Sequence, residues 1–160
     1  MKVVHVVTGM KAEAAGPSYS VPGLCRGLVE AGVDVRIHTL RKPQDRNFPF
    51  EVVEHPYNNK VLQRLLPIRW AGRLLKGVVE DCKDADIVCS NGLWEMPCVY
   101  PAWAKKRTGC KLVTAPRVAL AANVLKYGRC KKKIFFSLSQ FFGFQLFQAK
   151  GIDNWTAKLV

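Results

Sequence analysis

The sequence predicts an α/β fold: a single Rossmann-like domain of three layers with a mainly parallel sheet. Short runs of β-branched apolar residues alternate with segments whose apolar residues recur at helical spacing. The connections between them are short, and strands joined through helices pair in parallel by right-handed crossovers. The first run, Lys2–Thr8, lacks the polar alternation of a half-exposed strand, which is typical of a buried parallel strand.

The first helix is expected over Ser20–Ala31. Ser18 or Ser20 can cap its start, and Gly32 can end it in the left-handed conformation. Its apolar residues predict one buried stripe, made of Val21, Leu24, Cys25, Leu28 and Val29.

The other elements follow in order along the chain. A helical region is expected over Val61–Cys82 with a break at Pro67, and a further helix from Pro97 to Lys106 that stops by Gly109. The remaining strands are expected at Val33–Thr39, Phe50–His55, Asp86–Ser90 and Lys111–Ala115. Of these, Phe50–His55 has the composition of an edge strand.

The composition is that of a folded domain. Of the 160 residues 49% are hydrophobic, and no apolar run reaches the roughly 18 residues of a membrane span. The first apolar run is short and no cleavage-type site follows it, so we expect no signal peptide and a cytoplasmic protein. The six cysteines form no C-x-x-C pair and no histidine lies near a cysteine pair, so we expect buried or incidental thiols and no metal site.

The net charge of +13 is concentrated in the second part of the chain. Residues 1–95 carry +2, whereas residues 96–160 carry +11. A basic block precedes six of the eight phenylalanines and consists of Lys126, Arg129, Lys131, Lys132 and Lys133. It indicates either an interfacial segment at an anionic membrane surface or a solvated helix face beside apolar surface whose covering domain is missing. No RNA- or DNA-binding module is recognisable, so nucleic acid is not an expected partner.

Three loops, at residues 9–18, 91–95 and 115–120, are expected to meet at the carboxyl edge of the sheet, where open α/β sheets bind ligands. The first leads into a helix, so free N–H groups and the helix dipole can hold an anion there. Gly9 and Gly16 lie seven residues apart, the second strand ends without an acid, and no Walker lysine follows. These features argue against NAD and against a P-loop; a plain turn without a ligand is the alternative.

Polar side chains follow two strands at this edge. Arg117 can hold a phosphate or a sugar, or can form a surface ion pair. Asn91, Trp94 and Glu95 can bind a sugar through its hydroxyls and its ring face. The alternatives are Trp94 packed under the next helix and Glu95 as a charge at that helix's N-terminus. His5 lies within the first strand and is expected to be a satisfied core histidine.

Three segments, residues 1–40, 86–120 and 125–135, resemble the N-terminal domain of family-4 glycosyltransferases. The resemblance covers about residues 1–138 and implies one half of the GT-B architecture, in which two Rossmann-like domains face a cleft. It implies that a loop at the first helix approaches the donor diphosphate, through Ala15, Gly16, Pro17 and Ser18. It further implies that the acceptor is bound by Asn91, Trp94, Glu95 and Arg117, and that the basic block faces membrane lipid.

Three positions depart from the family's usual pattern. Ala15 and Val118 stand where glycines are usual, and Cys89 stands where a histidine is usual. A glycine lets the backbone approach a phosphate, and Val118 resists a positive φ. A histidine donates to a sugar hydroxyl, which Cys89 does poorly.

The strands that should follow Lys131–Lys133, and the whole C-terminal donor domain, are missing from the sequence. We therefore expect a domain over 1–138, a divergent Phe-rich tail over 139–160, and a truncated chain. The resemblance implies the acceptor-side half of a retaining glycosyltransferase of polysaccharide biosynthesis, with a UDP- or GDP-linked sugar as donor and no obligatory metal.

By itself this chain is expected to bind no cofactor and to be inactive. The implied partners are a sugar or lipid-linked sugar acceptor and a separate C-terminal donor domain, at the inner face of the membrane. The alternative is a membrane-surface or partner-binding module that uses residues 126–133 and the Phe-rich tail.

Overall fold

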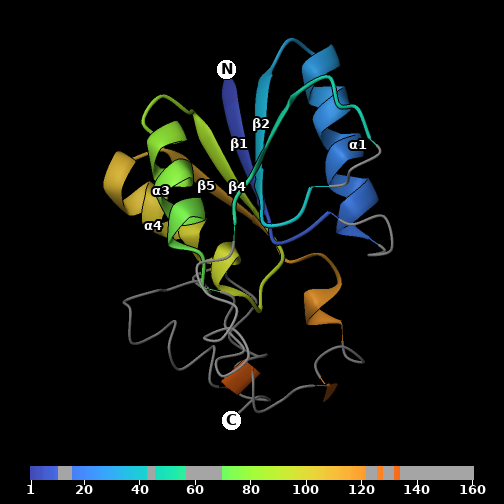
Figure 1. Ribbon diagram of the computed structural model, residues 1–160, viewed down its shortest axis with the longest axis vertical. Helices are drawn as coiled ribbons and strands as arrows, with labels where there is room; N and C mark the ends of the chain where they lie inside the picture. Colours follow the sequence, from blue (N-terminus) through green and yellow to red (C-terminus); the bar gives the residue numbers. More distant parts are fainter. Residues whose placement is uncertain (11–15, 43–45, 57–69, 122–125, 128–131, 134–160) are drawn as a thin grey trace. The chain divides into compact units, whose positions relative to one another are not determined.

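The computed structural model describes residues 1–10, 16–42, 46–56, 70–121, 126–127 and 132–133. The chain divides into two compact units, Met1–Arg117 and Val118–Val160. The first unit holds all the strands of the described residues and the helices that cover them (Figure 1). The predicted domain boundary near residue 138 lies outside the described residues.

The sheet has five parallel strands in the order β3-β2-β1-β4-β5. They are β1 (Lys2–Val7), β2 (Asp34–Thr39), β3 (Glu51–Glu54), β4 (Ile87–Asn91) and β5 (Lys111–Ala115). All five predicted strands are present, and the third lies at an edge, as expected. The chain leaves β1 on one side toward β2 and returns on the other side to β4, so the topological switch point lies beside β1.

Of the helices in the described residues, α1 (Pro17–Glu30) covers one face of the sheet, and α3 (Gly72–Asp81) and α4 (Tyr100–Thr108) cover the other (Figure 1). Short 3₁₀ turns, η1 (Met96–Cys98) and η2 (Arg117–Leu120), precede α4 and follow β5. This arrangement is the predicted Rossmann-like α/β fold in three layers. The part of the predicted Val61–Cys82 region that includes Pro67 lies outside the described residues, and α3 is its second part. No helix in the described part of the chain has the length and apolar character needed to cross a membrane.

Helix α1 begins three residues earlier than predicted. Pro17 occupies its first turn, and Gly16 precedes it with φ 83°, a conformation that glycine adopts without a steric penalty. No side chain caps this end, so the predicted serine cap is wrong. The predicted left-handed residue after the helix is confirmed at Gly32, with φ 78°.

The core between α1 and the sheet consists of Val7, Met10, Val21, Cys25, Val35 and Ile37. Leu28 and Val29 pack against it, but Leu24 is 49% exposed. The prediction that Leu24 belongs to the buried stripe is therefore wrong. At 100° per residue Leu24 lies at the margin of the arc that Val21, Cys25 and Leu28 direct to the sheet.

A closed polar network lies on the opposite face and joins β2, β3 and α3. His38 Nε2 donates to Asp81 Oδ2 at 2.7 Å, and its Nδ1 lies 2.8 Å from His55 Nε2. Arg36 pairs with Asp81 and with Glu51. Burial lowers the pKa of His38 and lowers that of His55 to about 4, so both rings are neutral at pH 7. Neutral His38 has one N–H group, and it donates that group from Nε2 to the Asp81 carboxylate. The Nδ1 atom of His38 must therefore accept from His55 Nε2–H.

Gly77 on α3 makes room for this histidine pair. A Cβ at that position would lie 2.7 Å from His55 Cε1 and 3.4 Å from His38 Cε1. The two imidazole rings stack at a centroid distance of 5.1 Å. A residue without a side chain is therefore needed where α3 crosses them.

Candidate functional site

The structure brings two of the predicted site residues together at the carboxyl edge of the sheet. Asn91 is the last residue of β4 and is paired with Ala115 at the end of β5. Arg117 follows two residues later, and its Nη2 donates to Asn91 Oδ1 at 2.8 Å. The interaction links two strand ends that are adjacent in the sheet but 26 residues apart in the sequence.

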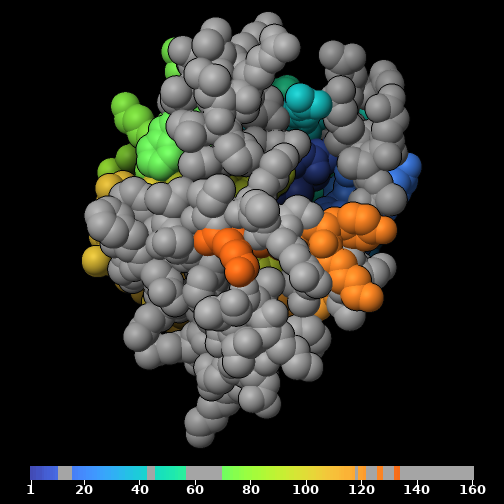
Figure 2. Space-filling view, turned by 90° about the horizontal axis from the view of Figure 1, so that it is seen from below, coloured from blue at the N-terminus to red at the C-terminus, as the bar shows by residue number. Residues whose placement is uncertain are grey.

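Asn91 also reaches the central strand. Its Nδ2 donates to His5 Nδ1 at 3.3 Å and to the Val6 carbonyl oxygen at 3.4 Å. The register places Asn91 beside Val7 and Cys89 beside His5, so the His5 and Asn91 side chains share the face that α1 covers. Arg117, Asn91 and His5 form a hydrogen-bonded line across β5, β4 and β1, which we call the Arg117–Asn91–His5 line. Figure 2 views the molecule from this edge.

The line fixes the protonation of His5. Because Arg117 donates to the Asn91 oxygen, the amide nitrogen faces His5, and His5 Nδ1 must accept. Burial, and next the positive charge of Arg117, lower the pKa of His5 to about 4, so the ring is neutral at pH 7. Its proton therefore lies on Nε2.

His5 is only 2% exposed, yet its Nε2 has no hydrogen-bond partner in the part of the chain that the structure describes. The prediction of a buried histidine is confirmed, but the prediction that it is satisfied is wrong. Buried polar atoms are nearly always hydrogen-bonded, so an unpaired one needs an explanation. The sequence signal was a polar residue inside an otherwise apolar strand, next to the topological switch point.

Arg117 has two further unusual features. Its φ is 56°, the left-handed region, which costs a residue with a Cβ on the order of 1 kcal/mol and is enriched at functional sites. Its Nε is buried without a partner, and it forms no ion pair with any described carboxylate. The surface ion pair that we gave as the alternative role of Arg117 is thus not seen among the described residues. The strained residue of this turn is Arg117 and not its neighbour Val118.

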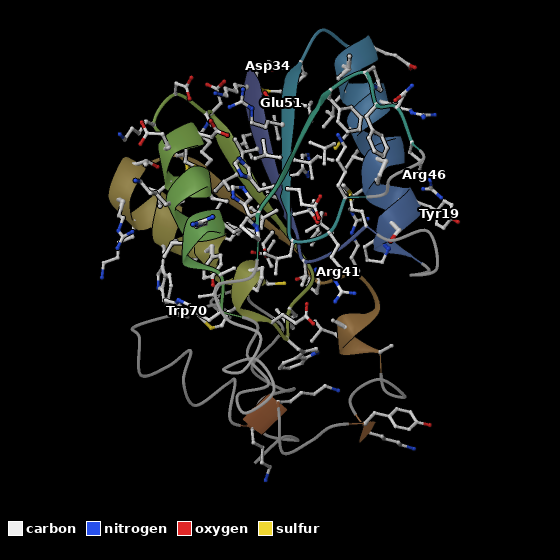
Figure 3. The ribbon with its side chains drawn as sticks, viewed as in Figure 1. Tyr19, Asp34, Arg41, Arg46, Glu51 and Trp70 are labelled. Carbon is white, nitrogen blue, oxygen red and sulfur yellow. The ribbon has the colours of Figure 1, made fainter. Side chains whose placement is uncertain are left out.

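The start of α1 lies at the same edge of the sheet. Ser18 is 1% exposed and its Oγ has no described partner, while Arg46 Nη1 donates to its carbonyl oxygen at 3.1 Å. Arg46 also lies 4.3 Å from the centre of the Tyr19 ring, on the outer side of the helix (Figure 3). No side chain caps the first turn of α1, but Pro17 has no N–H group, and those of Tyr19 and Ser20 donate to the Gly16 carbonyl oxygen at 3.0 and 2.9 Å. Only the Ser18 N–H group of this turn is left without a described partner. Ala15, the first residue of the predicted donor-phosphate loop, lies outside the described residues.

Trp94 and Glu95 lie in the bend between β4 and η1, and both are half-buried. Glu95 directly precedes η1. Gly92 opens the bend with φ 117°, where a Cβ would lie 3.1 Å from Cys98 Sγ. The bend therefore depends on a glycine at this position.

Of the predicted basic block, only Lys126, Lys132 and Lys133 lie in the described part. Lys126 and Lys133 are exposed, whereas Lys132 is 8% exposed and its Nζ donates to the Tyr127 carbonyl oxygen at 2.7 Å. The ammonium group of Lys132 is thus engaged by its own segment. Arg129 and Lys131 lie outside the described residues.

The described residues contain no group of three or more His, Cys, Asp or Glu side chains that could hold a metal ion. No protein-family model, curated protein or solved structure matches the chain. The resemblance to family-4 glycosyltransferases therefore stays a prediction.

Proposed function

We propose that this protein binds a sugar or sugar derivative at the carboxyl edge of its sheet, as the acceptor-side half of a retaining glycosyltransferase. The observation that carries the proposal is the contact between Arg117 and Asn91 at the ends of β5 and β4. It offers a cation and an amide at the switch point of a parallel sheet, where ligands of such folds bind.

Each residue of this edge has a defined role in the proposal. Arg117 attracts and orients the ligand through charge and directional N–H groups. Asn91 sets the orientation of the guanidinium, and the half-buried Trp94 offers an aromatic face near the edge. The Ser18 N–H group and the positive end of the α1 dipole support the proposal that the loop before this helix approaches the donor diphosphate.

The donor, a UDP- or GDP-linked sugar, would be held mainly by the C-terminal domain of the GT-B architecture and not by the acceptor-side domain described above. We therefore expect this chain to bind an acceptor without transferring a sugar. An anionic membrane surface, where lipid-linked acceptors lie, is the proposed location.

The test is calorimetry of the 160-residue chain with UDP- and GDP-sugars and with candidate acceptor sugars, beside a thermal melt that confirms folding. Acceptor binding that weakens about tenfold or more in R117A, and not in R107A, would support the proposal. Arg107 is a suitable control because it is an exposed arginine in the last turn of α4. A folded chain that binds neither class of sugar would contradict it.

A further inference from the structure

The carboxyl edge contains two buried N–H donors without partners among the described residues. They are His5 Nε2, whose proton is assigned by the Arg117–Asn91–His5 line, and Arg117 Nε. Neutral Nε2–H and guanidinium Nε–H groups can only donate. The missing partner of each must therefore be an acceptor atom.

The charge around these donors is positive. Arg117 is half-buried and carries a full charge that no described carboxylate pairs with. Its field lowers the pKa of His5, and it acts in the same direction on the thiols of Cys25 and Cys89. Isolated charges are costly in partly buried positions unless an opposite charge meets them.

Five acidic side chains of the described part pair with groups other than Arg117. They are Asp81 and Glu51 with Arg36, Asp84 and Asp86 with Lys2, and Glu80 with Lys83. A ligand, rather than a side chain of the described part, is therefore the candidate partner for the guanidinium.

We propose that His5 and Arg117 form an oxyanion subsite that binds a phosphate group, with one oxygen accepting from His5 Nε2–H and another from Arg117 Nε–H. The proposal rests on the proposed function and names its ligand class: a phosphorylated sugar rather than a neutral one. Asn91 is the positioning residue, because its amide fixes the tautomer of His5 and orients the guanidinium of Arg117. Arg117 has its strained φ in the turn that follows β5, from which its guanidinium reaches Asn91.

The probes are inorganic phosphate, a hexose 1-phosphate, acetate and the neutral hexose, titrated into the ¹⁵N-labelled chain. Long-range ¹H–¹⁵N spectra of the imidazoles read the tautomer of His5 directly. We expect Nε2–H before addition, and a shift of the His5 Nε2 and Arg117 Nε signals with both phosphates. Acetate tests whether a carboxylate suffices, and a shift at least as large with acetate as with phosphate would contradict the phosphate assignment.

Three variants and a control complete the experiment. R117A and N91A should each weaken binding of inorganic phosphate by about tenfold or more, whereas R107A should leave it unchanged. H5F removes the ring donor from the core; should it not fold, the His5 signals of the unmodified chain still decide the question. A His5 signal that no anion moves would overturn the subsite, since a buried water would then be its partner.

The outcomes separate this inference from the proposed function. Neutral hexose binding with unmoved His5 signals, and no effect of phosphate, would overturn the subsite and leave the proposed function standing. Inorganic phosphate binding without any sugar or sugar phosphate would support the subsite and contradict the proposed function. Phosphate shifts confined to exposed lysines, retained in R117A, would mark nonspecific anion association and overturn the subsite.

Discussion

Two polar clusters lie on opposite faces of the same sheet and differ in one respect. In the cluster of His38, His55, Asp81, Arg36 and Glu51, the side chains bond to one another, and none of their buried polar atoms is left without a partner. On the α1 face, the Arg117–Asn91–His5 line leaves two N–H donors and the charge of Arg117 without partners among the described residues. The first arrangement stabilises the fold by itself, and we propose that a ligand completes the second.

The largest effect is expected from breaking the closed cluster. D81A should reduce the free energy of unfolding by about 2–4 kcal/mol, because Arg36 loses one carboxylate and His38 Nε2 is left as a buried unpaired donor. Urea denaturation measures the change. D34A, at an exposed residue that begins β2, is the control and should change stability by less than about 0.5 kcal/mol. Equal losses in the two variants would contradict a structural role for the cluster.

Acidification should act on both clusters. The folded-state pKa of His5 and of His55 is about 4, below the ordinary 6.5, so the unfolded chain binds more protons between these values. Each neutral histidine should therefore make its full contribution to the free energy of unfolding above pH 6.5. As the pH falls toward 4, the free energy of unfolding should decrease by on the order of 1–3 kcal/mol for each histidine.

Denaturation curves at several pH values test this prediction, and the variants H5F and H55Q separate the two contributions. Each variant should have a flatter pH dependence than the unmodified chain in this window. A stability that does not change between pH 7 and pH 5, or that rises on acidification, would contradict the assignment of neutral buried rings.

A smaller decrease in the free energy of unfolding is expected from filling the space beside the His38–His55 pair. G77A places a Cβ 2.7 Å from His55 Cε1, which should cost about 1–3 kcal/mol through overpacking. G23A on α1 is its control, since nothing lies within 4 Å of that Cβ, and it should stabilise the helix by up to about 1 kcal/mol. Thermal melts measure the difference between the two variants. A G77A variant as stable as G23A would contradict the prediction, since the His38–His55 pair would then move aside at no cost.

Several features of the fold could be predicted from local patterns. The alternation of apolar runs and helical spacing predicted all five strands, because burial of parallel strands leaves a direct compositional signal. Arg117 and Asn91 could be predicted as site residues because each lies at a strand end, and parallel strands end at one edge. Their contact follows from β4 and β5 being neighbours.

Other features depend on contacts that no local pattern contains. The pairing of His38 with His55 requires β2 beside β3 and a glycine on α3 opposite both. The unpaired Nε2 of His5 follows only once the Asn91 amide has been oriented by Arg117. The predicted start of α1 at Ser20 is wrong because it assumes a serine cap. Gly16 and Pro17 instead supply the backbone conformation that begins the helix at Pro17.

The most direct test of whether Arg117 binds a ligand is the stability of R117A with and without phosphate. Without an anion, R117A should change stability by no more than about 1 kcal/mol, because it removes an unpaired charge and a strained arginine along with one hydrogen bond. Phosphate at 100 times its Kd should stabilise the unmodified chain by about 2.7 kcal/mol, and the same concentration should stabilise R117A by no more than about 1.4 kcal/mol. A variant that is strongly destabilised in the absence of anions, yet retains the full stabilisation by phosphate, would show that Arg117 supports the fold and not a ligand.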